Sequence, residues 1–362
     1  MKISFVGDIV CRNFDSTKFT LNNIESFKDN DIIVGNLEGP IFDEDYTCVK
    51  NNGIGLYSTN AVIKLLNYFN IDSLFIGNNH INDFNSSIKN TTNKLKNENK
   101  HYCGAGENIT EANQAISYNI NNEKVLLYGF GWKNSGCKIA TKYKDGVNPF
   151  EYKHIISTLK SARKLNPDTL IIFMFNWNYD MEILPHPAYR RLSQELIDNG
   201  LDAIVGYHPH IVQGIEIYKD KPIVYGMGNW YIPQEVYCGK RVLFPNLCNT
   251  QVKIQLIFKK REFQNIILEW YEFNKNTNTL KYKSTEELNI SETIEKLTPF
   301  KNLSNKEYDV YFKKHRRNKK FMPIYYKLNS KYNFFKDIWH LFRQTIVNIL
   351  INMKLKTKHT NK

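Results

Sequence analysis

The first 232 residues alternate short apolar runs with segments of helical periodicity, and this rhythm restricts the fold more than any other feature. Strand candidates include Ile3–Val6, Ile32–Val34, Ser73–Ile76, Val125–Tyr128, Thr169–Phe175, Ala203–Val205 and Pro222–Tyr225. Between them, apolar residues recur at helical spacing in Ala61–Phe69, Ser87–Leu95, Tyr152–Leu165 and Tyr189–Asn199. Such alternation is typical of β-α-β units, so an α/β fold around a mostly parallel sheet is predicted.

After this region the pattern changes to that of an antiparallel hairpin. Residues Gln251–Phe258 and Gln264–Phe273 alternate apolar and polar side chains around the turn-like stretch Lys259–Glu262. The hairpin is expected to close a sheet, and the polar, Asn- and Thr-rich residues that follow read as a loose connection. The predicted division is a main domain over residues 1–275, a linker over 276–300, and a basic, partly helical tail over 301–362.

The formal net charge of +13 is confined to that tail. Residues 301–362 contain 16 Lys and Arg against 3 Asp and Glu, whereas residues 1–300 contain 33 of each sign. A basic field limited to one segment indicates a surface or partner for the tail, because the main domain is formally neutral. No nucleic acid is expected as a partner, since the tail contains no recognisable nucleic-acid-binding motif.

The tail combines a basic run with an amphipathic pattern. Residues 311–320, YFKKHRRNKK, are predicted to be solvated and flexible. Apolar residues then recur at helical spacing: Phe335, Ile338, Trp339, Phe342, Ile346, Ile349, Leu350 and Met353. Residues 311–356 therefore suit either an anionic membrane surface or docking on a protein, the chain's own domain or a partner.

The sequence also bears on the compartment. It begins MKISFVGDIV, which reads as a buried strand without the zones of a secretory signal, and no run of 18 apolar residues appears. Six cysteines lack any CxxC spacing, so reduced thiols are expected. These features predict a cytoplasmic protein, or one peripheral at the inner face of the membrane.

Side chains able to bind a metal follow the predicted strands. They are Asp8 in VGDIV, Asn36 and Glu38 in GNLEGP, Asn79 and His80 in GNNHIND, Asn176 in FNWNYD, and His208 and His210 in GYHPH. The carboxyl ends of strands form the ligand-facing edge of α/β sheets. Mixed oxygen and nitrogen donors suit one or two divalent ions such as Mn, Fe, Zn or Mg, which activate water for hydrolysis. A metal-dependent hydrolase of phosphoester-like bonds is predicted.

Each group also has an ordinary structural explanation. Asp8 could cap a turn, and Glu38 could be a solvated loop acid. Residues 78–80 could begin a helix, with Asp83 supporting its first turn. Two histidines separated by proline after a strand are harder to explain in this way, and the coincidence of five such strand ends favours the metal interpretation.

The ordered motifs VGDIV, NLEGP, NNHINDF, YCGAGENITEA and ELIDNGLDAIVGYHPHIVQGIEIYKDKPIVYGMGNW resemble the CapA family. This family is associated with poly-γ-glutamate and capsular polymer synthesis and belongs to the calcineurin-like metallophosphatase superfamily. The resemblance covers roughly residues 1–275 and implies a four-layer αββα sandwich of two mixed sheets. It also implies an anionic polymer or a phosphoester as substrate.

The resemblance implies roles for single residues. Asp8 would be a ligand of the first ion, Glu38 a bridging carboxylate, and Asn79 a ligand of the second ion. His80 would be the general acid that protonates the leaving group. His208 and His210 would complete the second and first sites.

Two further residues are candidates for substrate binding. Arg12 could clamp an anionic substrate by bidentate hydrogen bonds, or be an ordinary surface arginine. Asn229, in the family's Gly-Asn-Trp loop, could line the substrate pocket or could stabilise a turn.

The sequence departs from the pattern at two positions. Val10 stands where the superfamily has the histidine of Asp-x-His. Asn176 stands where the family has the histidine of His-Trp-Gly-x-Glu, and an amide oxygen is a weaker ligand than imidazole. Asn176 is kept as a candidate ligand, with His186 as a compensating histidine or a loop residue. The alternative is a catalytically weakened polymer-binding or scaffold subunit, and a third option is a peripheral membrane factor dominated by its tail.

Overall fold

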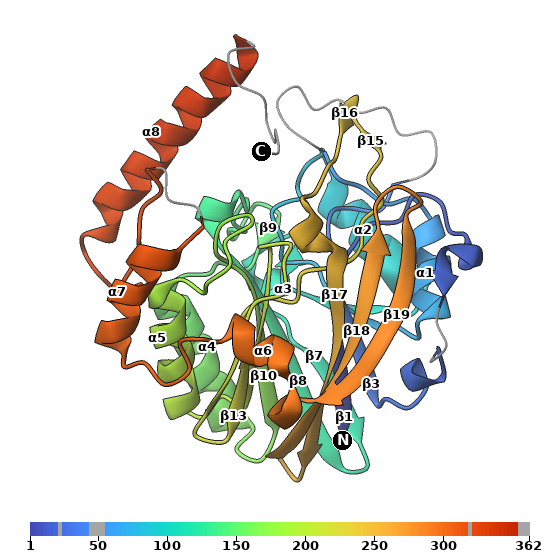
Figure 1. The fold of residues 1–362 in the computed structure, drawn as a ribbon, viewed down its shortest axis with the longest axis horizontal. Helices are drawn as coiled ribbons and strands as arrows, with labels where there is room; N and C mark the ends of the chain where they lie inside the picture. Colours follow the sequence, from blue (N-terminus) through green and yellow to red (C-terminus); the bar gives the residue numbers. More distant parts are fainter. Residues whose placement is uncertain (21–23, 43–54, 318–320, 354–362) are drawn as a thin grey trace.

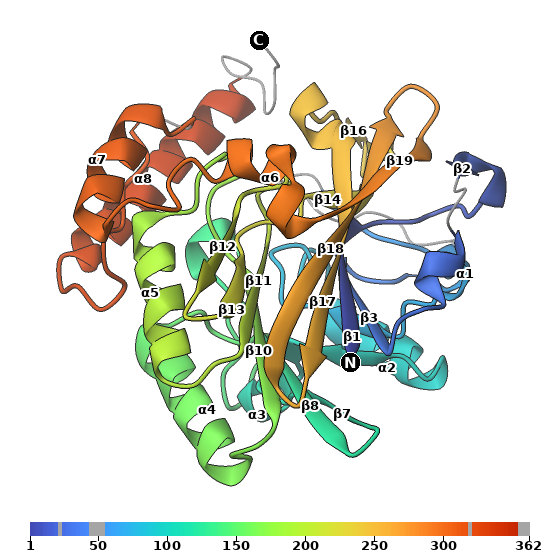
Figure 2. The same ribbon diagram turned by 60° about the horizontal axis from the view of Figure 1, so that its bottom comes forward.

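The computed structural model describes residues 1–20, 24–42, 55–317 and 321–353. Two mixed β-sheets pack face to face, and helices cover the outer face of each (Figures 1 and 2). The predicted α/β class and the four-layer αββα sandwich are confirmed.

Among the described residues, the first sheet has nine strands in the order β2-β19-β18-β17-β1-β3-β4-β5, with β14 beside β1. Their bounds are β1 Lys2–Ile9, β2 Phe19–Thr20, β3 Ile32–Leu37, β4 Ser73–Phe75, β5 His101–Cys103, β14 Asn229–Tyr231, β17 Thr250–Lys259, β18 Glu262–Asn274 and β19 Thr279–Glu287. Strands β1, β3, β4 and β5 run parallel, and β17 to β19 add an antiparallel half, as the hairpin pattern predicted.

In the described part of the chain, the second sheet has six strands in the order β12-β13-β11-β10-β8-β7. Their bounds are β7 Ile116–Ile120, β8 Glu123–Gly131, β10 Leu170–Asn176, β11 Ala203–Tyr207, β12 Ile215–Tyr218 and β13 Lys221–Val224. Two short pairs lie outside the sheets: β6 Ala105–Gly106 with β9 Gly146–Val147, and β15 Val236–Tyr237 with β16 Lys240–Arg241.

The helices flank the sheets on both sides. Their bounds are α1 Ala61–Tyr68, α2 Ser87–Asn97, α3 Ile109–Ala112, α4 Tyr152–Leu165, α5 Pro187–Asp198, α6 Glu292–Leu297, α7 Asn305–His315 and α8 Asn333–Asn352. Side chains of α1 and α2 share a core with the outer face of the first sheet, and those of α4, α5 and α7 with the second.

The central strands are buried on both faces. In β10, Ile172 and Met174 point into the core between the sheets, whereas Ile171 and Phe173 point toward the helices. Because successive side chains of a strand face opposite ways, such a strand must be apolar throughout. This explains why the predicted central strands appear as continuous apolar runs.

The predicted linker over residues 276–300 is wrong. Residues 279–287 form β19, which pairs antiparallel with β18, and α6 follows it. The hydroxyl of Thr298 accepts a hydrogen bond from the backbone N–H of Ile215 at 3.0 Å, which ties this segment to the second sheet. Most side chains of β19 are exposed or half-buried, so the strand lacks the apolar signal that marked the others.

The tail is helical, as predicted, but its first part is integrated into the domain. Helix α7 packs against α5, where Asp309 accepts hydrogen bonds from both terminal nitrogens of Arg191 at 2.6 and 2.7 Å. The expected flexible basic run is wrong for residues 311–315, which lie in α7, and Arg316 is buried 3.8 Å from Glu182. Residues 318–320 and 354–362 lie outside the described residues.

Four cysteines, Cys11, Cys103, Cys137 and Cys248, are free and buried. Cys238 is in a disulfide bond, so the expectation of reduced thiols is wrong for this residue. Cys48 lies outside the described residues. Within the described chain, no helix combines the length and the apolar character needed to cross a bilayer.

Candidate metal centre

Polar side chains from both sheets meet at one edge of the sandwich. Strands β1, β3 and β4 of the first sheet and β10 and β11 of the second deliver the side chains that the sequence singled out. Direct contacts connect Asp8 with Glu38 through Asn36, and Asn79 with Asn176 and His208. The structure therefore brings together groups as far apart in the chain as Asp8 and His210, which are in direct contact.

The position of Asp8 depends on a close approach of two strands. Asp8 lies in β1, between β3 and β14, and its backbone N–H donates to the carbonyl of Gly228 at 3.0 Å. A Cβ atom at Gly7 would lie 2.0 Å from that same carbonyl oxygen. Only glycine fits at position 7, and this close contact fixes the carboxylate of Asp8 in the interior.

Asn36 holds the two carboxylates together. Its Nδ2 donates to Asp8 Oδ1 and to Glu38 Oε2, both at 2.7 Å. The orientation of this amide follows from Asn78, whose Oδ1 accepts from the backbone N–H groups of His80 and Ile81. The Nδ2 of Asn78 must then donate to Asn36 Oδ1, at 3.0 Å. Asn36 thus positions the two carboxylates, with both ends of its amide engaged in hydrogen bonds.

Among the described residues, two buried oxygen atoms at this edge have no hydrogen-bond partner, Glu38 Oε1 and Asn176 Oδ1, and the one group near Asp8 Oδ2 is the ring of His210, 3.0 Å away. Buried polar atoms are almost always satisfied, so such a group requires an explanation, and an ion is one. Among the described residues, no three His, Cys, Asp or Glu side chains already form a metal cluster. Two of the four carboxylate oxygens of Asp8 and Glu38 are occupied by the Asn36 amide. The remaining oxygens and the nearby imidazoles fit a divalent cation.

The two histidines after β11 have unusual backbone conformations. His208 has a φ of 95° and His210 a φ of 60°, in the left-handed region that non-glycine residues rarely adopt. Such conformations cost on the order of 1–3 kcal/mol each and persist where the surroundings impose them. His208 Nδ1 lies 3.0 Å from Asn79 Oδ1, and His210 Nδ1 lies 3.0 Å from Asp8 Oδ2. The strain turns both rings toward the carboxylate edge.

Burial and neighbouring charges shift the pKa values at this edge. Burial and the negative charge of Asp8 raise the pKa of Glu38 to about 7, against the opposing effect of His80 and His210. Burial alone would lower the pKa of His210, but Asp8, Glu38 and Asp180 raise it to about 10. Burial lowers the pKa of His208 to about 4. A cation would replace the positive charge that the protonated ring of His210 otherwise places beside the two carboxylates.

His80 lies beside this group with a carboxylate behind it. Its Nδ1 is 2.6 Å from Asp83 Oδ2, and its Nε2 is 3.9 Å from Glu38 Oε1. Residues 79–86 form turns, and α2 begins only at Ser87, so the alternative of a helix starting at residues 78–80 is wrong. Asp83 orients the ring of His80, a role that sequence reasoning missed although Asp83 follows His80 by only three residues.

Asp180 is another residue that the sequence did not single out. Its Oδ1 lies 3.1 Å from His208 Nε2, on the side of the ring opposite Asn79. The carboxylate is half-exposed. The sequence signal that could have identified Asp180 is its position four residues after Asn176, beyond the end of β10.

The structure places the remaining candidate site residues in different surroundings. Asn229 lies in this group, with its Oδ1 2.9 Å from His210 Nδ1. Arg12 contacts Glu235, with Nη2 2.5 Å from Oε2, and its guanidinium lies over the ring of Tyr237. Its role as a substrate clamp remains a prediction. His186 contacts the backbone of Tyr325 and cannot replace a ligand at this edge.

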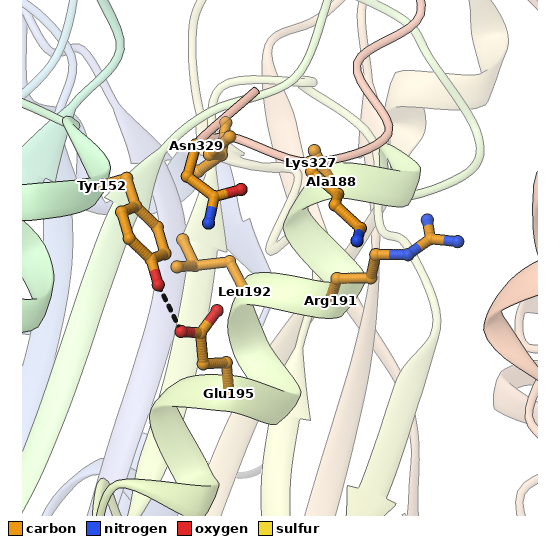
Figure 3. Close-up of a pocket in the computed structure, with 8 residues that line it drawn as sticks. Tyr152, Ala188, Arg191, Leu192, Glu195, Lys327 and Asn329 are labelled. Carbon is orange, nitrogen blue, oxygen red and sulfur yellow. Dashed lines mark hydrogen bonds between the residues drawn. The ribbon is translucent and has the colours of Figure 1, made fainter. Parts of the chain in front are cut away.

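A separate small pocket lies on the helical layer of the second sheet (Figure 3). Its volume is about 160 Å³, and it is lined by Tyr152, Ala188, Arg191, Leu192, Glu195, Lys327, Leu328 and Asn329. Tyr152 donates a hydrogen bond to Glu195 across it. None of the predicted site residues lines this pocket, and it is smaller than the roughly 300–1,000 Å³ of typical ligand pockets.

Comparisons with known proteins identify relatives of the main domain. Residues 2–234 match the sequence profile of the family described as bacterial capsule synthesis protein PGA_cap. The capsule biosynthesis protein CapA of Bacillus anthracis is 29% identical over 249 residues, which cover 65% of this chain and 60% of that protein. The PGA biosynthesis protein CapA of Bacillus subtilis (strain 168) is 27% identical over 244 residues, or 65% of this chain and 64% of that protein.

The matched regions thus span less than two thirds of either CapA protein. Among solved structures, a 5'-nucleotidase precursor from Thermus thermophilus aligns with a TM-score of 0.42 and 10% identity. That alignment covers 77% of this chain and 56% of the nucleotidase.

Proposed function

Because this chain belongs to the bacterial capsule synthesis protein family, we propose that it is a divalent-metal-dependent hydrolase that acts in capsule or exopolymer biosynthesis. The bond cleaved is a phosphoester or a related linkage, and the polymer is poly-γ-glutamate or a polysaccharide. The names of the relatives from Bacillus support the pathway, and the donor groups at the sandwich edge support the chemistry.

The observation that carries this proposal is the pair of buried carboxylates, each with one oxygen that the Asn36 amide leaves open to the edge. Asp8 Oδ2 and Glu38 Oε1 belong to carboxylates that are fully buried and held in place by the same amide. Burying two carboxylates side by side is costly unless a positive charge joins them. A divalent cation supplies that charge, polarises a phosphoryl or carbonyl oxygen of the substrate and activates water.

The protein's own residues would do the rest. Asp8, Glu38 and His210 would hold a first ion, and Asn79, Asn176 and His208 would hold a second. Asp83 keeps Nδ1 of His80 occupied, so Nε2 is the ring nitrogen directed toward the carboxylates. The side chain of His80 is 17% exposed, whereas that of Glu38 is fully buried, so His80 lies where a leaving group would depart. His80 would there act as general acid.

One observation favours a second candidate function. Asn176 supplies an amide oxygen at the end of β10, a weaker ligand than an imidazole, and its Nδ2 is bonded to Asn79. If the second position binds its ion poorly, the protein is a catalytically weakened, polymer-binding or scaffold subunit of a capsule-synthesis system.

Replacing His80 tests the catalytic role. We expect His80→Ala to reduce kcat on generic phosphomonoesters and phosphodiesters, assayed with Mn²⁺, by about 10²-fold or more. The bound metal, measured by elemental analysis of the same preparations, should be unchanged because His80 is not a predicted ligand. His315→Ala, an exposed histidine of α7, is the matched control and should keep full activity.

Turnover of His80→Ala at the level of the control would exclude the role of general acid. A wild-type protein that holds metal but cleaves neither ester would favour the scaffold function. A wild-type protein that holds no metal would remove the basis of the hydrolase proposal.

A further inference from the structure

Helix α8 is attached to the domain by its polar side. Asp337 Oδ1 accepts hydrogen bonds from Asn134 Nδ2 and from the hydroxyl of Tyr325, both at 2.7 Å. One turn further, the buried ring of His340 stacks on Tyr179 with centroids 5.8 Å apart. The only acidic residue of α8 and its histidine therefore face the protein.

The opposite side of α8 is apolar and faces solvent. Large apolar side chains on it are all at least 40% exposed: Phe334, Phe335, Ile338, Trp339, Leu341, Phe342, Ile346, Ile349 and Met353. At 100° per residue these positions, with Met353 directly after the helix included, fall within one half of the helix circumference, which also contains the polar positions Thr345 and Asn352. We call these nine side chains the outer face of α8.

This arrangement reverses that of an ordinary surface helix, which buries its apolar side and exposes its polar side. Scattered apolar residues on a surface need no explanation, but a continuous stripe of this length marks an interaction site. Helix α8 lies at the periphery of the molecule in both views (Figures 1 and 2). The outer face is thus accessible to a large flat partner.

We propose that the outer face of α8 inserts into the interface of an anionic lipid bilayer, with the helix axis in the membrane plane. The charge of this part of the chain is complementary to such a surface: residues 301–362 contain 16 Lys and Arg against 3 Asp and Glu. A one-sided stripe of Phe, Trp and aliphatic side chains next to basic residues is what binding to an anionic interface requires.

A second copy of the chain fits this face less well. A helix of 20 residues is about 30 Å long and about 10 Å across, so two copies would bury far less than the ~1,600 Å² of a standard protein interface. The strong basic charge of the tail would also repel an identical copy.

Flotation of the full-length protein with vesicles tests the proposal. Binding is expected to vesicles that mix phosphatidylcholine with phosphatidylglycerol, and to fall when the anionic lipid is omitted or the salt is raised. The double variant Ile338→Glu, Phe342→Glu should bind about tenfold more weakly or worse. The matched control Leu165→Glu, Ile290→Glu also replaces two exposed apolar residues, on other elements, and should bind like wild type.

Both variants change exposed side chains, and circular dichroism with thermal unfolding verifies that they fold. Failure of the wild-type protein to bind either kind of vesicle would overturn the proposal, as would equal binding by the two double variants. The proposal also fails if sedimentation equilibrium shows a dimer that only Ile338→Glu, Phe342→Glu dissociates, since a second copy would then cover the outer face.

Discussion

Asn36 shows how much of the candidate centre depends on residues that do not touch a metal. Its amide joins the carboxylates of Asp8 and Glu38, and the backbone of residues 80 and 81 fixes its orientation through Asn78. Such outer partners set the geometry and basicity of ligands. At the residue scale, the cluster is an ordered network in which only a few oxygens are left for an ion.

Asn176 offers the sharpest single-residue prediction. The nearly isosteric change Asn176→Asp adds a carboxylate to a fully buried position. Without metal the variant should unfold at a lower temperature than wild type, because an unpaired buried charge is costly, on the order of several kcal/mol. With Mn²⁺ the unfolding temperature should rise more in the variant than in wild type. Differential scanning calorimetry in chelator and in Mn²⁺ measures both.

Asn148→Asp is the matched control. Asn148 is equally buried, but its side chain bonds to Asn113, the carbonyl of Gly129 and His154, outside the centre. This variant should also unfold at a lower temperature than wild type in chelator. Mn²⁺ should raise its unfolding temperature no more than it raises that of wild type. An identical Mn²⁺ response of the two variants would contradict a cation position at Asn176.

At the element scale, the sequence predicted the central strands and most helices within a few residues. The predicted helix Tyr152–Leu165 has the same bounds as α4, because its apolar positions recur at helical spacing and face a single core. The predicted connection over residues 276–300 failed because β19 exposes one face and is rich in polar residues. Helix α7 was missed because its apolar residues Tyr308 and Phe312 lie among many charged ones.

The docking of α7 and the segment after it onto α5 makes stability depend on pH. Burial lowers the pKa of His186, at the start of α5, to about 3. The unfolded chain therefore binds one more proton than the folded chain between about pH 6.5 and pH 3. Stability is fully present above about pH 6.5 and falls by up to about 1.4 kcal/mol per pH unit below it.

Replacing His186 with a residue that does not titrate should remove this slope. His186→Asn should flatten the dependence of the free energy of unfolding on pH by about 1 kcal/mol per unit, measured by denaturant titrations from pH 7 to pH 4. His101→Asn, at an exposed histidine of β5, is the control and should keep the wild-type slope. A wild-type slope in His186→Asn would refute the assignment.

At the scale of the whole molecule, the alternation of strands and helices predicted the α/β class and the strand ends that carry donors, because it is a local signal, whereas the two-sheet sandwich followed from the family resemblance. It could not predict the Asn36 clamp, the Asp180 contact or the docking of Arg191 on Asp309, since these depend on how distant segments meet. The outward orientation of the α8 stripe was also beyond the sequence. Periodicity shows that a helix has two faces but not which one contacts the protein.

The central claim is that donors from both sheets surround a common divalent cation. The most direct test is a crystal structure of the full chain grown with Mn²⁺, with anomalous difference density recorded near the manganese absorption edge. We predict a peak within bonding distance of Asp8 Oδ2 and Glu38 Oε1 and beside the ring of His210. The absence of any peak there at saturating Mn²⁺, or peaks confined to the surface, would contradict the account.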